Sequence, residues 1–279
     1  MSRVVVTGAA GLLGRELVRT FAAAGHEVMP LTHREIDLLH PSSLERISAS
    51  RPEIVVNAAA WTDVDGCARD PERALRINGD GAGHVANASA GALVVQISTN
   101  EVFDGARHEP YAEGDEPNPV NPYGASKLAG EEGVARATDR HLVIRTAWLF
   151  GPHRGFPARL RAAAERASAA GQPLRVVEDE WGNPTPVGPL AKAIVTAAER
   201  IGPKSGPRVL HLAGEPPTSR LAWARDVLAD LPVELRPITQ AEYERPSHVP
   251  PRAVLDMSRA RALGLPVMDW RPRPTEVAR

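Results

Sequence analysis

The chain has 279 residues, a hydrophobic content of 43% and a formal net charge of -1. This charge gives no support for a nucleic-acid partner or for a membrane partner held by bulk electrostatics. The single cysteine, Cys67, excludes intramolecular disulfides and a cysteine-rich metal cage, and it fits a reducing compartment. The first residues lack a signal peptide's apolar stretch, and no apolar run approaches the roughly 20 residues that span a bilayer. We therefore expect a cytoplasmic protein with a large core.

The first half of the chain alternates short apolar runs with helical stretches. Strands are expected at residues 4–6, 27–31, 54–57, 93–98 and 141–146, and helices at 12–24, from 41 onward, at 71–89 and at 123–137. Ser42 and Ser43 are available to cap the helix that Pro41 opens. A loop rich in proline, glycine and acids spans residues 103–122. This alternation predicts an α/β fold with a Rossmann-like, doubly wound parallel sheet.

The second half has a different organisation. Helices are expected at residues 156–170, 189–200 and 219–231 and strands at 174–177 and 209–213, followed by a proline-punctuated tail from Pro232. We expect a smaller C-terminal lobe over the carboxyl ends of the sheet strands. The predicted division is a dinucleotide-binding domain at residues 1–150 and a substrate-binding lobe at residues 151–279, with the two interleaved.

A glycine-rich turn joins the first strand to the first helix. Gly8, Gly11 and Gly14 are spaced three apart, and Leu12 and Leu13 open the helix. Glycines allow a tight turn and close approach of a pyrophosphate to the backbone, while the helix N-terminus offers free N–H groups. The third strand ends in Asn57 followed by Ala58, Ala59 and Ala60, which we expect to complete the cofactor site. Because glycine-rich turns are common, the pattern predicts dinucleotide binding only in this strand-to-helix context.

The end of the second strand bears on the choice of cofactor. Arg34 lies 20 residues beyond Gly14, next to His33, at a position where NAD-specific sites often carry an acid. An arginine there can pair with a 2′-phosphate, so we expect NADPH, with NADH as the alternative. In the alternative interpretation Arg34 is a solvated loop residue and Glu35 or Asp37 faces the ribose. Asp37 and Leu38 are expected to flank the adenine.

Tyr123 and Lys127 are one helical turn apart, so their side chains can share a face. A nearby ammonium lowers the pKa of a tyrosine, which makes the tyrosine a usable general acid for carbonyl reduction. The lysine can also hydrogen-bond the nicotinamide ribose. Ser98 and Thr99 end the fourth strand, where ligands of α/β proteins bind, and Thr99 can donate to a substrate oxygen. The competing interpretation is the ordinary start of an amphipathic helix.

Six stretches match a known family in order and spacing over nearly the whole chain. They are TGAAGLLG at 7–14, NAAAWTDVD at 57–65, ISTNEVFDG at 97–105, NPYGASKLAGE at 121–131, IRTAW at 144–148 and GNPT at 182–185. With these motifs the chain resembles the extended short-chain dehydrogenase/reductases, and among them the dTDP-4-dehydrorhamnose reductases. The resemblance implies NAD(P)H-dependent reduction of the C4 keto group of a nucleotide-linked 4-keto-6-deoxy sugar, most closely dTDP-4-dehydrorhamnose to dTDP-L-rhamnose.

The resemblance also implies roles for individual residues. The family's catalytic threonine, tyrosine and lysine fall on Thr99, Tyr123 and Lys127. Its sugar-contacting tryptophan falls on Trp148, for which core packing is the alternative, and Val64 lies near the site or in the core. Members sometimes use Mg²⁺, which the sequence neither supports nor excludes, and no motif in the chain predicts a metal site. We expect a monomer or a homodimer.

Two departures from the family pattern concern the sugar pocket. Asn100 and Glu101 replace the usual Asp-Tyr, and Trp61 replaces the usual tyrosine. We expect Asn100 and Glu101 to contact substrate, so a different 4-keto sugar is an open alternative. Because superfamily dehydratases carry acids beside the catalytic threonine, another sugar-nucleotide epimerase, dehydratase or reductase is a second alternative. A third is a non-catalytic NADP-binding regulatory subunit, as in the methionine adenosyltransferase β subunit.

Overall fold

The computed structural model describes residues 1–152, 154–200, 208–266 and 268–271. Its centre is a sheet of six parallel strands in the order β10-β5-β4-β3-β1-β2. The strands are β1 (Arg3–Thr7), β2 (Glu27–Leu31), β3 (Ile54–Asn57), β4 (Leu93–Thr99), β5 (His141–Thr146) and β10 (Val209–His211). The predicted Rossmann-like α/β fold is confirmed. Near-continuous apolar runs form these strands because both faces of a doubly wound sheet are covered.

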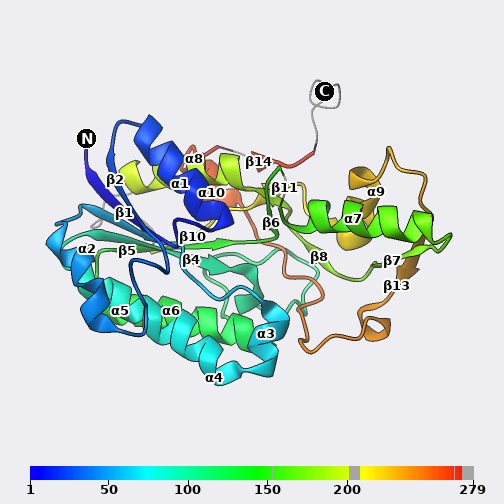
Figure 1. Cartoon of the computed structure of the whole chain (residues 1–279), viewed down its shortest axis with the longest axis horizontal. Helices are drawn as coiled ribbons and strands as arrows, with labels where there is room; N and C mark the ends of the chain where they lie inside the picture. Colours follow the sequence, from blue (N-terminus) through cyan, green and yellow to red (C-terminus); the bar gives the residue numbers. More distant parts are fainter. Residues whose placement is uncertain (153, 201–207, 267, 272–279) are drawn as a thin grey trace.

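Helices pack on both faces of the sheet (Figure 1). Helices α1 (Leu12–Ala23) and α8 (Val187–Arg200) share one apolar core on one face, together with β1, β3, β4 and β5. Helices α2 (Glu45–Ala49), α5 (Gly81–Ala88) and α6 (Pro122–Ala137) lie on the other face. The chain crosses from β1 to β2 on one side and then continues to β3 on the other. Parallel sheets bind ligands at such a reversal, so the β1/β3 boundary is where a cofactor is expected.

The connection from β3 to β4 is more complex than the single helix predicted at residues 71–89. It contains α3 (Val64–Arg69), α4 (Pro71–Ala74), a π-helical segment η2 (Leu75–Asp80) and α5. Asp63 and Asp70 cap α3 and α4 by accepting from backbone N–H groups one turn later. The segment opened by Pro41 is a 3-10 turn, η1 (Pro41–Leu44), followed by α2. The prediction of a serine cap is wrong there, because His40 is the N-cap residue and no side chain caps the turn.

A smaller lobe projects from one end of the sheet (Figure 1). It contains α7 (Phe156–Ala169), β7 (Leu174–Val177), α9 (Arg220–Val227) and β13 (Leu235–Ile238), with β7 and β13 paired in parallel. The lobe has its own apolar core, formed by Leu160, Ala164, Val176, Leu221, Ala224 and Leu228.

The chain returns to the large sheet after residue 150. Both α8 and β10 belong to the sheet layer, although they come from the second half of the sequence. A cut at residue 150 therefore does not separate the sheet from the lobe. The role of residues 151–279 in substrate binding stays a prediction, and residues 272–279 lie outside the described part of the chain.

Short pairings complete the connections. They are β6 (Leu149–Phe150) with β9 (Thr185–Pro186), β8 (Trp181–Gly182) with β12 (Thr218–Ser219), and β11 (Gly214–Glu215) with β14 (Met268–Asp269). The remaining helical turns are η3 (Asn100–Val102), η4 (Gln240–Glu242) and α10 (Ser258–Ala262).

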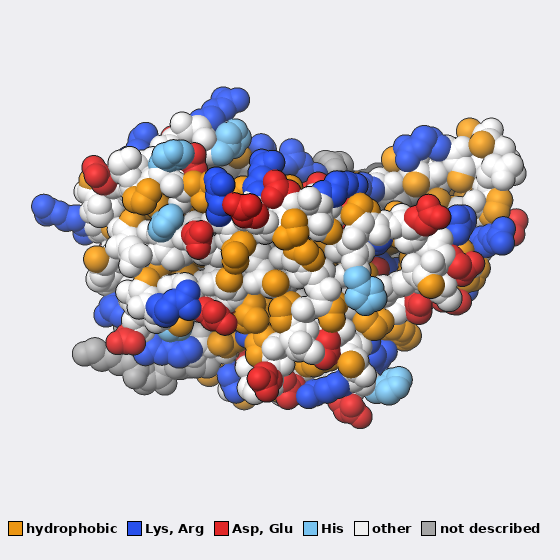
Figure 2. Space-filling model, turned by 90° about the horizontal axis from the view of Figure 1, so that it is seen from below, with side chains coloured by type: hydrophobic (Ala, Val, Ile, Leu, Met, Phe, Trp, Pro, Cys, Tyr) orange, Lys and Arg blue, Asp and Glu red, His pale blue; other side chains and the backbone are white. Residues whose placement is uncertain are grey.

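Cationic and anionic side chains are interspersed on the molecular face drawn in Figure 2, in keeping with the net charge of -1. Among the described residues, no helix combines the length and the apolar character needed to cross a bilayer.

Candidate active site

The glycine turn after β1 is shaped by steric limits at two of its glycines. Gly8 has φ +67°, and a Cβ there would lie 2.6 Å from the carbonyl oxygen of Ala58. A Cβ at Gly14 would overlap the carbonyl oxygen of Gly8. The Gly11 N–H donates to that same carbonyl at 2.9 Å and Gly11 is the N-cap of α1, so the next N–H groups have no partner inside the helix. The turn thus has the form that holds a pyrophosphate.

A cavity of about 820 Å³ opens at the carboxyl ends of β1, β2 and β3. Most of the residues predicted to bind a cofactor line it: Gly8, Gly11, His33, Asp37, Leu38, Ala58, Ala59 and Ala60. Below the turn, Leu13 is in the core, Gly14 is buried and Leu12 packs against the same core. Arg34 is exposed and is not among the residues that line the cavity. A dinucleotide fits the cavity, given these free N–H groups and the absence of Cβ atoms at the turn.

Ten further residues that the sequence interpretation did not assign to the cofactor line the cavity. They are Ala10, Thr32, Ile36, Leu39, Trp61, Asp70, Glu72, Arg73, Arg76 and Ile77. The last three are spaced i, i+3 and i+4, so they share one helix face. That spacing was the available signal, but nothing in the sequence places this face beside the glycine turn.

The structure brings Thr99, Tyr123 and Lys127 together at the carboxyl end of β4 and the start of α6. Asn121 caps α6, accepting from the Gly124 N–H at 2.8 Å, and this fixes Tyr123 in the first turn. The Thr99 hydroxyl lies near enough to the Tyr123 phenol to lower the pKa of the phenol. Lys127 is buried, and its ammonium donates to the carbonyl oxygen of Ile97 at 2.6 Å. A donor hydroxyl, a phenol and an ammonium therefore stand at the ligand-binding edge of the sheet.

The ionisation of these groups differs from the expectation in one respect. Burial raises the pKa of Tyr123, the carboxylate of Glu101 raises it further, and only the nearby Thr99 hydroxyl opposes them. Burial lowers the pKa of Lys127 to about 8, against the opposing effect of Glu131. The predicted lowering of the Tyr123 pKa by Lys127 is therefore not present here. The reason is that the Glu101 carboxylate and desolvation outweigh any favourable charge near the phenol.

The hydroxyl of Ser98, predicted to contact cofactor, is engaged in the structure: it donates to Glu131 at 2.5 Å. Glu131 also forms a buried ion pair with Arg145, with an N–O distance of 2.7 Å. Ser98 thus contributes to the polar core beneath the site, and its side chain has a structural partner.

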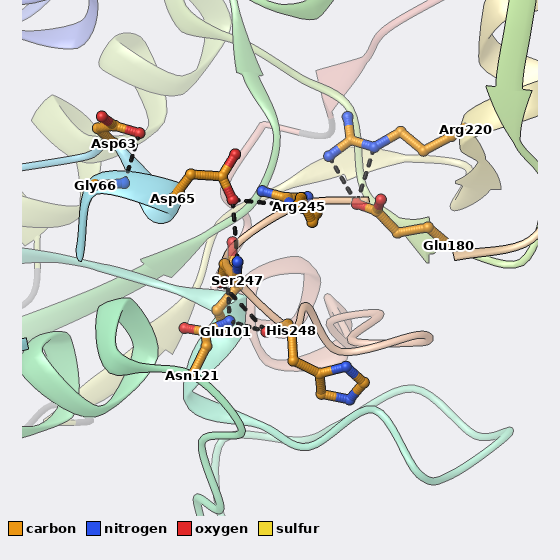
Figure 3. Close-up of polar contacts among 10 residues, drawn as sticks. All are labelled: Asp63, Asp65, Gly66, Glu101, Asn121, Glu180, Arg220, Arg245, Ser247 and His248. Carbon is orange, nitrogen blue, oxygen red and sulfur yellow. Dashed lines mark hydrogen bonds and ion pairs between the residues drawn. The ribbon is translucent and has the colours of Figure 1, made fainter. Parts of the chain in front are cut away.

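Glu101 belongs to a polar network in which Asn121 joins it to the segment at residues 245–248 (Figure 3). Its Oε2 accepts from Asn121 Nδ2 at 2.7 Å, and the same amide donates to the carbonyl oxygen of His248 at 2.9 Å. Burial raises the pKa of Glu101 to about 7, and Glu180 raises it too, while the hydrogen bond from Asn121 and the charges of Arg245 and Arg220 lower it. A carboxyl group that titrates near neutrality therefore faces the tyrosine.

The lobe side of the site contains Trp148, in an unusual conformation with φ +45°. The indole of Trp148 stacks on Trp223 with ring centres 5.8 Å apart. The Arg220 guanidinium lies 3.5 Å from the ring centre of Trp148. A Cβ at Gly182 would lie 2.6 Å from the indole, so the glycine of the GNPT motif provides room for Trp148. Arg220 is also paired with Glu180 at 2.9 Å. Strained backbone of this kind is concentrated at functional sites.

The two remaining candidates for substrate contact lie near this region. Asn100 is buried, and its amide donates to the carbonyl oxygen of Ala253 at 2.9 Å, which ties the C-terminal segment to β4. Val64 is half-buried at the start of α3, beside Asp65. Asp65 Oδ1 accepts from Arg245 Nε at 3.0 Å, so residues 245–248 cross the site from the lobe to α3 (Figure 3).

A second cavity of about 630 Å³ lies on the lobe side of this crossing segment. Its lining includes Glu180, Tyr243, Arg245 and His248. Among the described residues, no group of three or more His, Cys, Asp or Glu side chains is arranged to hold a metal ion.

A doubly wound sheet, a glycine turn and a threonine–tyrosine–lysine site define a protein of the short-chain dehydrogenase/reductase class. Residues 2–279 match the model of the RmlD substrate binding domain, and the chain belongs to this family. It is 37% identical over 281 residues to a dTDP-4-dehydrorhamnose reductase of Mycobacterium tuberculosis, covering 96% of this chain and 90% of that protein.

Two further relatives bear on the cofactor and on the sugar. A dTDP-4-dehydrorhamnose reductase structure from Bacillus anthracis in complex with NADP superposes with a TM-score of 0.87 at 30% identity, covering 96% of this chain and 95% of the other. A probable dTDP-4,6-dihydroxy-2-methyloxan-3-one 4-ketoreductase of Streptomyces antibioticus is 36% identical over 277 residues, covering 96% of this chain and 92% of that protein.

Proposed function

We propose that this protein is an NAD(P)H-dependent reductase of the C4 keto group of a nucleotide-linked 4-keto-6-deoxy sugar. The favoured reaction converts dTDP-4-dehydrorhamnose to dTDP-L-rhamnose, as the name of the mycobacterial relative suggests. The observation that carries the proposal is the grouping of Thr99, Tyr123 and Lys127 at the same carboxyl edge of the sheet as the cavity of the glycine turn, although none of the three lines that cavity. NADPH is the proposed cofactor because the Bacillus anthracis relative binds NADP, and NADH remains the alternative.

When bound, the nicotinamide cofactor supplies the hydride. Thr99 donates a hydrogen bond to the keto oxygen, where negative charge develops. Tyr123 then transfers its proton to that oxygen, and its raised pKa keeps it protonated at neutral pH so that the proton is present. Lys127, which reaches the strand edge at Ile97, donates to the ribose and holds positive charge beneath the site.

The lobe and the crossing segment are proposed to hold the nucleotide sugar. Trp148 with the Arg220 guanidinium on its ring is the proposed contact for the sugar, and Arg220 and Arg245, now paired with Glu180 and Asp65, are the proposed contacts for the diphosphate. In this arrangement the sheet layer binds the cofactor and the lobe binds the substrate, in the cytoplasm. The chain acts as a monomer or a homodimer.

A different 4-keto sugar is the second candidate, and one observation favours it. Glu101 places a carboxyl group in the sugar pocket, where the family pattern has a tyrosine. The Streptomyces antibioticus relative, named for another keto sugar, is 36% identical to this chain. An epimerase or dehydratase would use such a carboxyl group as a base, and a non-catalytic NADP-binding subunit would need none of the three catalytic groups.

The deciding experiment follows NADPH and NADH oxidation by the purified chain with enzymatically generated dTDP-4-dehydrorhamnose. We expect oxidation with dTDP-L-rhamnose as product. Tyr123→Phe should abolish turnover while cofactor affinity stays nearly unchanged, because only the transferred proton is lost. Normal turnover of this variant would contradict the mechanism. Tight NADPH binding by the wild-type chain without oxidation would direct attention to other 4-keto sugars and then to a binding subunit.

A further inference from the structure

Trp61 is held at the edge of the dinucleotide cavity by a buried amide. Asn78 is 2% exposed, and its Oδ1 accepts from the Trp61 N–H at 2.8 Å. Its Nδ2 donates to the carbonyl oxygen of Trp61 at 3.0 Å and to the hydroxyl of Ser126 at 2.9 Å. Ser126 in turn donates to the carbonyl oxygen of Tyr123 at 2.7 Å. Both backbone groups of Trp61 are thus fixed to the helix that carries the catalytic tyrosine.

Arg73 lies on this fixed tryptophan. Its guanidinium is 4.6 Å from the ring centre of Trp61, within the range of a cation–π contact, and both residues line the cavity. The position is set by α4, which Asp70 caps by accepting from the Arg73 N–H at 3.0 Å. Among the described residues neither Arg73 nor Arg76 takes part in an ion pair. The Arg73 guanidinium therefore rests on the Trp61 ring, outside any ion pair, in a wall that Asp70 and Glu72 also line.

The π-helical segment brings a second arginine to the same wall. Residues 75–80 form η2, and Arg76 and Ile77 from this segment line the cavity. Single π turns within helices frequently occur at functional sites. The glycine turn across the cavity offers only N–H groups and the partial charge of one helix end, which is less than the charge of a pyrophosphate. The full charges on this wall are those of Arg73 and Arg76, which share it with the carboxylates of Asp70 and Glu72.

The strand order indicates whether Arg73 is nearer to the pyrophosphate of the dinucleotide or to a 2′-phosphate on its adenosine ribose. Strand β3, which leads to Trp61, lies directly beside β1 and its glycine turn. Strand β2, whose end is the expected place of the adenosine ribose and any 2′-phosphate, lies on the other side of β1. Helix α1, which follows the glycine turn, covers one face of the sheet, and α4, which carries Arg73, lies below the other face (Figure 1).

We propose that Arg73, seated on Trp61, binds the pyrophosphate of the dinucleotide from the side opposite the glycine turn. The inference rests on the proposed use of a dinucleotide and adds a charged contact that is common to NADH and NADPH. Trp61 acts as a positioning residue for the guanidinium, because its own backbone is fixed by Asn78.

The test is a calorimetric titration of the full chain with NADPH and, separately, with NADH. No sugar substrate is present. Arg73→Ala should raise both dissociation constants by the same factor, about 10- to 100-fold, since a charge-assisted hydrogen bond is lost. Arg73→Lys should recover part of the affinity, and Trp61→Leu should weaken both cofactors less than Arg73→Ala does. Arg69→Ala is the matched control, because Arg69 is exposed at the end of α3 and does not line the cavity.

Two results would overturn the inference. Unchanged affinity in a folded Arg73→Ala variant would show that the guanidinium makes no phosphate contact. A loss confined to NADPH would place Arg73 on the 2′-phosphate and away from the pyrophosphate. Failure of the wild-type chain to bind either dinucleotide would instead contradict the proposed function, so the two failures are distinguishable.

Discussion

Glu101 shows how one side chain can change the electrostatics of a site whose proposed catalytic residues follow the family pattern. Its carboxyl group stands where the family pattern has a neutral tyrosine, and it faces Tyr123, Asn121, Glu180, Arg220 and Arg245. Below pH 7 the group is largely neutral, and above it the group is negative. The negative form disfavours both a diphosphate substrate and an alkoxide developing beside Tyr123.

We therefore expect kcat/KM for the sugar nucleotide to fall as the pH rises through about 7, the pKa of Glu101. Glu101→Gln should remove the inflection near pH 7, because the amide has the same shape but does not ionise, and should leave the inflection near pH 8 that belongs to Lys127. The measurement is kcat/KM against pH at saturating NADPH, with Glu116→Gln in the exposed loop as control. An inflection near pH 7 that persists in Glu101→Gln would assign that titration to another group.

The role of Arg34 in binding a 2′-phosphate stays a prediction. The spacing from Gly14 pointed to a 2′-phosphate contact, yet the side chain is exposed and does not line the cavity. Thr32 and Glu35 are hydrogen-bonded across this turn, and the Arg34 N–H donates to the Thr32 hydroxyl at 3.2 Å. The hydrogen bonds of this local turn set the direction of the Arg34 side chain. The spacing of 20 residues from Gly14 does not by itself determine that direction.

At the scale of elements, the start of α6 depends on a single asparagine with three partners. Asn121 caps the helix, donates to Glu101 and donates to the carbonyl oxygen of His248, and it is 4% exposed. Tyr123 and Lys127 follow directly, so this amide links the helix that carries the proposed catalytic residues to the crossing segment at residues 245–248.

Asn121→Ala should lower the free energy of unfolding by about 2 to 4 kcal/mol, because it removes a cap and leaves buried polar groups unpaired. Ser219→Ala is the control, since Ser219 caps α9 through one bond to the Ala222 N–H and should cost about 1 kcal/mol. Urea unfolding measures both. Equal losses in the two variants would mean that the additional contacts of Asn121 contribute nothing.

The predicted strands and most helices agree with the structure because their signals are local. Apolar runs such as Val4 to Val6 suit strands buried on two faces, and Gly25 ends α1 at its predicted place. The π turn at residues 75–80 carries no such signal. Its place coincides with Asn78, whose partners Trp61 and Ser126 come from distant parts of the chain.

At the scale of the whole molecule, the crossing segment ties the lobe to the sheet layer. Arg245 pairs with Asp65 at 3.0 Å, and the two side chains are 25% and 32% exposed. Partly exposed pairs contribute little to stability, typically less than about 1 kcal/mol. Because Arg245 also lines the second cavity, we expect the pair to serve substrate binding more than the stability of the fold.

A double-mutant cycle with Arg245→Ala and Asp65→Ala tests this role. We expect the free energy of unfolding to change by less than about 1 kcal/mol, while Arg245→Ala raises KM for the sugar nucleotide and leaves KM for NADPH unchanged. The pair Arg161–Asp230 in the lobe, at 2.7 Å, is the control and should affect neither constant. A large loss of stability with an unchanged KM would make the segment a structural clamp.

The sequence by itself determined the α/β class, the glycine turn and the spacing of Tyr123 and Lys127, because helix and strand periods and steric limits at glycine act over a few residues. Only the tertiary structure decided that β10 and α8 rejoin the sheet after residue 150, that Glu101 titrates near neutrality and that Arg73 faces the cofactor cavity. Burial, charge partners and cavity walls are made by residues far apart in the chain. Their effects therefore appear only once those residues are brought together.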